Sequence, residues 1–149
     1  MKKTDPPIIV QQRFQTSRED LWSAITDIKR MSEWYFEMIP DFRAEEGFTT
    51  EFVIRTPERE FVHKWRIEKV VPGEMISCHW SYSKYPGEGL VTMEIRRDKE
   101  EIIFTLTNEV LEDFDDSIPE FKRESCIGGW KWFINDRLAN YISKNSTEN

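Results

Sequence analysis

The chain has 149 residues, of which 38% are hydrophobic and 33% are charged, and this length fits one domain with its own core. Its formal net charge of -7 is spread along the sequence, which argues against nucleic acid or an anionic membrane as a partner. No apolar run is long enough to cross a bilayer and no signal-peptide pattern opens the sequence, so we expect a cytoplasmic protein without a membrane span.

The first part of the sequence predicts a strand and two short helices. Residues 8–14, IIVQQRF, read as a strand with Ile8, Val10 and Phe14 on one face, which Gln12 interrupts. In the following run, TSREDLWSAI, Thr16 and Glu19 have the spacing of a capping box, and apolar residues recur at helical intervals. We expect a second short helix in SEWYFE, beginning at Ser32.

From Ile39 to Leu111 the hydrophobic pattern changes to period two, which is typical of strands. Turn signals at Gly47, TPE, VPGE, YPGEG (85–89) and RDKEE divide this region into about five or six strands joined by hairpins. Runs such as FVHKWRIEKV, MISCHWSY and LVTMEIR place apolar side chains at alternate positions. One face of the predicted sheet is therefore apolar and needs a cover.

The last helix is the expected cover. Ser117 and Glu120 have the spacing of another capping box, and a helix over residues 117–144 would be about 40 Å long at 1.5 Å per residue. Its inward stripe on a helical wheel is Cys126, Ile127, Trp130, Ile134, Leu138 and Tyr141. Gly129 lies at the margin of this stripe, and Trp132 lies on the opposite side. Because glycine costs a helix about 1 kcal/mol, we expect Gly129 to give room for a close strand or for space beside the neighbouring tryptophan.

Disulfide and metal chemistry are not expected. Cys78 lies in a strand-like run and Cys126 in a helix-like run, which favours reduced, buried thiols. His79 falls on the sheet face opposite to Cys78 and is expected at the surface. No third ligand joins the two histidines, so we expect no zinc site.

The order of one strand, two helices, an antiparallel strand series and a long helix predicts an α+β helix-grip fold, in which a curved sheet wraps around the C-terminal helix. Four stretches of the sequence carry a resemblance to a known family. In chain order they are TSREDLWSAITDIKRMSEWY, WRIEKVVPGEMISCHW, LVTMEIRRDKEEIIFTLTNEVL and GGWKWFINDRLANYI. In these stretches the sequence resembles the START-like (SRPBCC, birch-pollen-allergen-like) superfamily and, within it, homologues of the C-terminal domain of the activator of the heat-shock protein ninety ATPase. The resemblance covers about Ile8 to Ser143. We expect a single domain over residues 8–144, with flexible termini at 1–7 and 145–149.

The resemblance implies a cavity between the sheet and the long helix, which in relatives often holds an apolar or amphipathic small molecule. Large aromatic rings on the inward faces either pack as ordinary core or form the wall of such a cavity. The expected lining residues are Trp34, Phe36, His63, Trp65, Trp80, Tyr82, Met93, Arg123, Cys126, Gly129, Trp130, Phe133 and Ile134.

Two of these residues carry alternative interpretations. His63 is either a hydrogen-bonded core histidine or a ligand contact or general base, and we favour the core role because spacing places no second titratable group beside it. Arg123 either lays its aliphatic stem on apolar surface or meets a ligand carboxylate or phosphate near the cavity mouth.

Three functions remain open. No nucleophile elbow, phosphate loop, dinucleotide fingerprint or paired-cysteine motif occurs, so we expect no catalytic residue, cofactor or metal and favour a non-enzymatic module that binds a hydrophobic or amphipathic small molecule. A co-chaperone-like protein-interaction domain is an alternative that the resemblance implies, with the outward Trp132 and the acidic EDFDDS as its features. A cyclase-like or hydrolase-like enzyme, a role of some superfamily members, would need a carboxylate or tyrosine within hydrogen-bond reach of His63.

Overall fold

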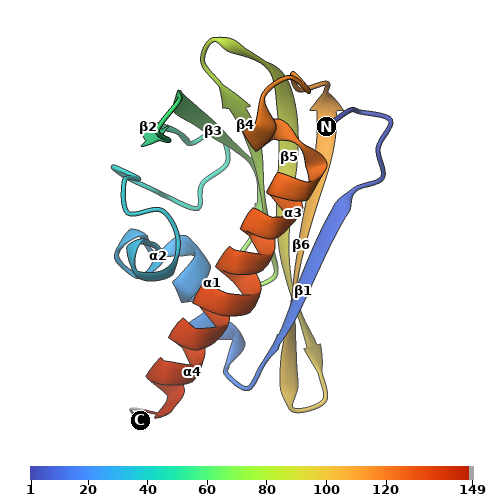
Figure 1. Cartoon of the computed structure of the whole chain (residues 1–149). Helices are drawn as coiled ribbons and strands as arrows, with labels where there is room; N and C mark the ends of the chain where they lie inside the picture. Colours follow the sequence, from blue (N-terminus) through green and yellow to red (C-terminus); the bar gives the residue numbers. More distant parts are fainter. Residues whose placement is uncertain (148–149) are drawn as a thin grey trace.

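The computed structural model describes residues 1–147, which form one antiparallel sheet crossed by a long C-terminal helix (Figure 1). The sheet has six strands in the order β1-β6-β5-β4-β3-β2. Their bounds are β1 Ile8–Phe14, β2 Thr49–Arg55, β3 Glu60–Val71, β4 Met75–Tyr82, β5 Tyr85–Asp98 and β6 Glu101–Glu112. The predicted α+β helix-grip fold is confirmed.

Two short helices follow β1, and local hydrogen bonds set where they start. Their bounds are α1 Arg18–Thr26 and α2 Ile28–Trp34. Ser17 caps α1 by accepting a hydrogen bond from the amide three residues later, so the predicted cap at Thr16 is wrong. Asp27 caps α2 by accepting from the Lys29 amide, two residues later, which starts the helix ahead of the predicted Ser32.

The C-terminal helix is built from several turns of different geometry. They are the 3-10 turn η1 Pro119–Phe121, α3 Arg123–Lys131, the π-helical segment η2 Trp132–Leu138 and α4 Ala139–Thr147. The predicted capping box at 117 is wrong. The Ser117 hydroxyl donates to the Asp115 carboxylate at 2.7 Å, and Glu120 binds the Arg59 guanidinium at 3.1 Å.

The π-helical segment changes which residues of this helix face the sheet. A π turn closes i to i+5 hydrogen bonds and is wider than an α turn, so a residue every fourth position stays on one face. The buried stripe is therefore Trp130, Ile134, Leu138 and Ile142. Tyr141, which an ideal wheel places inward, is half-buried and accepts a hydrogen bond from Arg30 at 2.9 Å.

Irregularities in the strands help the sheet to curve. Register shifts occur at Ile67/Lys69 in β3, Ser81/Tyr82 in β4 and Glu88/Gly89 in β5, and bulges of this kind bend a strand.

The turn predicted in YPGEG is wrong, because these residues lie inside β5. The chain instead reverses one step earlier, where Lys84 has a positive φ of 72°. Position 87 requires glycine for a reason other than a turn. Its φ is 117°, and a Cβ there would lie 2.3 Å from the Phe114 ring.

Both ends of the described chain contact the sheet or extend the helix. The Met1 side chain is buried, and its carbonyl accepts from the Phe114 amide at 2.9 Å, so the segment 1–7, expected to be flexible, is held at this point. Helix α4 continues to Thr147, so part of the expected flexible segment 145–149 is helical, and 148–149 lie outside the described residues. Within residues 1–147, no helix is both long and apolar enough to span a bilayer.

Candidate functional site

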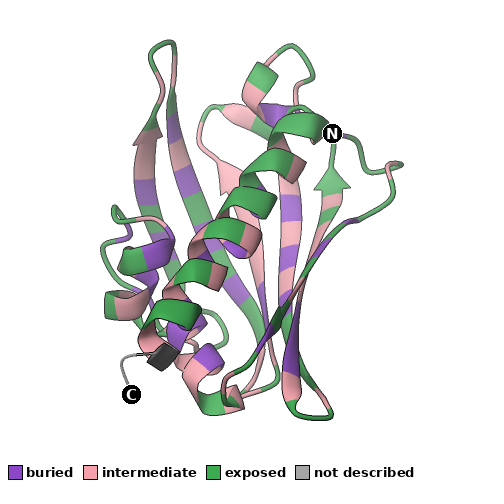
Figure 2. Cartoon of the chain, turned by 60° about the horizontal axis from the view of Figure 1, so that its bottom comes forward, coloured by how far each residue is buried: buried purple, intermediate pink, exposed green. Residues whose placement is uncertain are grey.

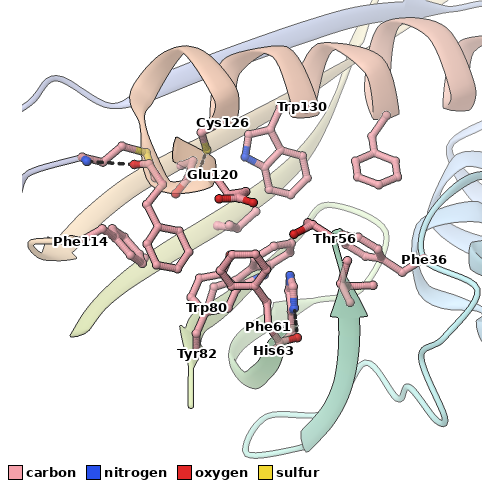
Figure 3. A pocket seen from close by; sticks show the side chains of 18 residues that line it. Phe36, Thr56, Phe61, His63, Trp80, Tyr82, Phe114, Glu120, Cys126 and Trp130 are labelled. Atoms are coloured by element: carbon pink, nitrogen blue, oxygen red, sulfur yellow. Dashed lines mark hydrogen bonds between the residues drawn. The ribbon is translucent and has the colours of Figure 1, made fainter. Parts of the chain in front are cut away.

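A cavity of about 250 Å³ lies between the sheet and the first turns of the C-terminal helix (Figure 3). Its floor comes from inward positions of β2 to β6, and its roof comes from η1, α3 and the start of η2. The predicted residues that line it are Phe36, His63, Trp80, Tyr82, Cys126, Gly129, Trp130 and Phe133.

Other lining residues were not predicted. They are Met1, Ile54, Thr56, Phe61, Gly89, Val91, Asn108, Phe114, Glu120 and Phe121. Phe61 had a usable signal, because it alternates with His63 in the same strand run. Phe114 and Phe121 lie in an irregular segment without periodicity, so only the folded chain brings their rings together, with centroids 5.5 Å apart.

Four predicted lining residues lie outside this cavity and in the core. Trp34 and Ile134 are fully buried, and the Trp34 indole donates to the Ala24 carbonyl at 2.8 Å. Trp65 and Met93 border a much smaller space of about 30 Å³ beneath α1 and α2. These residues were misplaced because the sequence pattern gives the face of a strand but not the element that covers it.

Arg123 is directed away from the cavity. Its guanidinium donates to the Pro6 carbonyl at 2.6 Å, outside the lining residues. This contact fixes the N-terminal segment against the helix. No other lysine or arginine of the described chain lines the cavity either.

His63 is the buried titratable group of the cavity floor. The exposed fraction of the residue is 6%, and Nδ1 lies 3.2 Å from the Phe61 carbonyl oxygen. Burial lowers the pKa of His63 from 6.5 to about 4, only partly opposed by this hydrogen bond. The imidazole is therefore neutral at pH 7.

Aromatic rings surround the imidazole. The Phe52 ring stacks on it with centroids 4.9 Å apart, and the Tyr82 ring meets it edge-on at 4.7 Å. Within residues 1–147, no carboxylate and no tyrosine hydroxyl forms a hydrogen bond with His63. The acid–base pair that an enzymatic role would need is not formed in this structure.

The two cysteine thiols are poor nucleophiles at neutral pH. Burial raises the pKa of Cys126 to about 11 and that of Cys78 to about 12, so both stay protonated at neutral pH. The Asn108 amide nitrogen donates to the Cys126 sulfur at 3.2 Å. Both cysteines are free, and both are partly rather than fully buried.

Gly129 provides cavity space rather than a close approach to a strand. A Cβ at Gly129 would meet no atom within 4 Å, and Gly129 lines the cavity beside Trp130. The expectation of a tight backbone contact is therefore wrong, and the alternative of open space describes the structure.

His79 lies on the far face of the sheet, as predicted, but it is not a free surface residue. Only 11% of its side chain is exposed, and its ring nitrogens lie 3.0 Å from the Glu68 carboxylate and 3.6 Å from that of Glu88 without forming a hydrogen bond in the described residues. In the described part of the chain, no cluster of His, Cys, Asp and Glu has the arrangement of a metal site.

A curved antiparallel sheet gripping a long C-terminal helix, with an apolar cavity between them, defines a START-like (SRPBCC) domain. Within that class, the chain belongs to the family described as Activator of Hsp90 ATPase homolog 1-like protein, which it matches over residues 15–143. The predicted family is therefore confirmed.

Solved structures of low sequence identity share the fold. DynU16, "a putative protein in the dynemicin biosynthetic locus", has a TM-score of 0.75 at 20% identity over 95% of this chain and 48% of that chain, so this chain spans about half its length. The Chromobacterium violaceum protein CV1439 has a TM-score of 0.72 at 19% identity, with 91% and 96% covered. The Aha1 dimer from Colwellia psychrerythraea has a TM-score of 0.68 at 16% identity, with 93% and 92% covered. None of the curated proteins matches the chain.

Proposed function

We propose that this chain is a non-enzymatic binding module that takes a small, mostly apolar molecule into the cavity beneath α3. The observation that carries the proposal is an aromatic-walled cavity of about 250 Å³ whose polar groups form no catalytic pair in the described residues. Small-molecule sites are concave, largely apolar and already formed in the free protein. The cytoplasmic location expected from the sequence is part of the proposal.

The cavity volume limits the ligand. An engineered cavity of about 150 Å³ binds benzene, whereas pockets for drug-sized ligands have about 300 to 1,000 Å³. A volume between these values suits one aromatic ring with a short alkyl chain better than a long fatty acid.

A matched pair of glycine variants tests the proposal, with propylbenzene as the probe. Both glycines are exposed, and a Cβ at either would meet nothing within 4 Å, but only Gly129 lines the cavity, so Gly129→Leu adds a side chain at the cavity and Gly128→Leu adds the same side chain away from it. We expect the parent protein and Gly128→Leu to bind the probe with similar dissociation constants and Gly129→Leu to lose binding. Calorimetry gives the affinities, and the indole N–H signals in NMR spectra show whether Trp80 and Trp130 sense the probe.

The contrary results are equally specific. Equal binding by both leucine variants would place the probe on the surface, and no binding by the folded parent protein would reject the small-molecule role.

A protein-interaction role is the second candidate, and one surface feature favours it. Trp132 is 49% exposed on the outer face of the C-terminal helix, where the Arg137 guanidinium lies 5.1 Å from its ring centroid. Exposed tryptophan and arginine are common at the centre of protein interfaces. Loss of a partner's binding in Trp132→Ala, with propylbenzene binding unchanged, would support this second role.

A further inference from the structure

The cavity contains few polar side chains, and most of them are already engaged. Glu120 accepts from Arg59 through both carboxylate oxygens, at 3.1 and 3.4 Å. The Asn108 amide donates to the sulfur of Cys126. The hydroxyls of Thr56 and Tyr82 both donate and accept, so they do not discriminate between ligands that donate and ligands that accept.

His63 differs from these groups because one of its nitrogens can only accept. The Phe61 carbonyl oxygen is an acceptor, so Nδ1, 3.2 Å away, carries the proton. Nε2 then has a lone pair. Figure 3 shows this second nitrogen on the side of the ring away from that hydrogen bond. No residue of the described chain donates to it.

The lone pair of His63 Nε2 in this aromatic cavity can select ligands that donate a hydrogen bond. Nε2 is not one of the fully buried unpaired atoms, so it is accessible from the cavity that His63 lines, and a ligand that donates a hydrogen bond can reach it. The surrounding rings of Phe36, Phe52 and Trp80 lie with centroids between 4.9 and 5.8 Å from the imidazole, and none of them forms a hydrogen bond with it.

We infer that the ligand is an uncharged molecule with an apolar body and one hydroxyl group of the phenol or alcohol type, which donates a hydrogen bond to His63 Nε2. The inference rests on the proposed function and names the chemical class of its ligand.

The charges of the cavity exclude anionic ligands. No lysine or arginine of the described residues lines the cavity, and the two cations at its border are already paired, Arg59 with Glu120 at 3.1 Å and the Met1 ammonium with Asp116 at 3.0 Å. A ligand carboxylate would lose its hydration without gaining a cation, and burying an unpaired charge is strongly unfavourable. A fatty acid or an aryl carboxylate is therefore a poor ligand, although its apolar body resembles that of a good one.

Three probes that share a 4-propylphenyl body and differ in the group opposite the propyl chain separate these properties: 4-propylphenol, 4-propylanisole and 4-propylbenzoate. The phenol donates a hydrogen bond, the methyl ether only accepts one, and the benzoate is charged. We expect calorimetry to give a dissociation constant about three- to tenfold lower for the phenol than for the ether. For the benzoate we expect a dissociation constant on the order of 100-fold higher than for the phenol. Equal affinities for the phenol and the ether would overturn the inference.

Two variants assign the hydrogen bond to its acceptor. His63→Phe keeps an aromatic ring at this position and removes the nitrogen, so the preference for the phenol over the ether should disappear. Tyr82→Phe removes a neighbouring hydroxyl and should keep the preference. The reverse result in the two variants would overturn the assignment to His63.

One measurement on the parent protein needs no substitution. The nitrogen-15 NMR signal of His63 Nε2 should shift on addition of 4-propylphenol and stay unchanged with 4-propylanisole, because only the phenol donates to the lone pair. An unmoved signal at saturating phenol would contradict the inference even where His63→Phe fails to fold.

Propylbenzene separates this inference from the proposed function. If propylbenzene binds to the cavity and the phenol binds no better than the ether, the binding role stands and the hydroxyl preference fails. If none of the probes binds, the binding role itself fails.

Discussion

The sheet face beneath the helices has two regions, one closed and one open. The packed half lies under α1 and α2, where Met31, Tyr35 and Trp65 border a space of about 30 Å³. The open half lies under η1 and α3, where Phe61 and Tyr82 border about 250 Å³. Both halves are rich in aromatic residues, so aromatic content does not decide which of them has room for a ligand.

The covering elements account for the difference. Both α1 and α2 have buried residues, which Figure 2 colours purple. Leu21, Ile25 and Met31 are among them. Over the open half, α3 begins at Arg123, and Gly129 presents no side chain between the rings of Trp130 and Phe133 that also line the cavity. The space of about 250 Å³ therefore includes the room that a side chain at Gly129 would take.

The largest expected effect is the loss of stability on Trp34→Ala in the packed half. Trp34 is fully buried, so the substitution removes a large ring and the hydrogen bond to Ala24, and the free energy of unfolding should fall by about 3 to 5 kcal/mol. Urea denaturation measures this change. Trp132→Ala is the matched control, with an expected change within about 0.5 kcal/mol because Trp132 is half exposed. Similar losses for both variants would remove the basis for calling this half packed.

In the open half, the pH dependence of stability should report the burial of His63. Its pKa is about 4 in the folded state and 6.5 as the reference value, so between these values the unfolded chain binds a proton that the folded chain does not. Stability due to this group is complete above pH 6.5 and falls as the pH approaches 4, by up to about 3 kcal/mol.

Denaturation curves at several pH values check this prediction. Carboxylates also titrate near pH 4, so the relevant quantity is the difference between the parent protein and His63→Phe. The variant should lose less stability from pH 7 to 4, and identical pH dependence in the two proteins would show that His63 does not carry the effect.

Tyr35→Phe tests whether the packed half contains a polar defect. The Tyr35 hydroxyl is buried without a hydrogen-bond partner in the described residues, and burial raises its pKa well above the usual value. Removing the hydroxyl should raise the free energy of unfolding by about 1 kcal/mol. A loss of similar size in thermal melts would indicate that the hydroxyl has a partner.

The smallest expected effect is a gain in stability from Gly129→Leu in the open half. Because the added side chain enters open space, only the helix propensity changes, by about 0.8 kcal/mol in favour of leucine. Gly128→Leu should gain a similar amount. A clear loss in Gly129→Leu alone would mean that the open half has less room than its volume indicates.

The sequence by itself determined the elements and their order. Period-two runs predicted the strand region, and helical spacing with a late glycine-tryptophan pair predicted the covering helix, because both periodicities are local properties of the chain. Together with the motifs of the resemblance, they were enough for the fold and the family. His63, Tyr82 and Trp130 were also placed on the correct inward faces.

Only the tertiary structure decided which inward residues meet open space. Trp65 and Tyr82 follow the same alternating pattern, yet α1 and α2 cover one of them and leave the other beside the cavity. In the same way, the π-helical segment decides that Ile142, and not Tyr141, belongs to the buried stripe of the C-terminal helix. Packing between elements far apart in the sequence determines such positions, and local periodicity has no information about the volume that those elements leave unfilled.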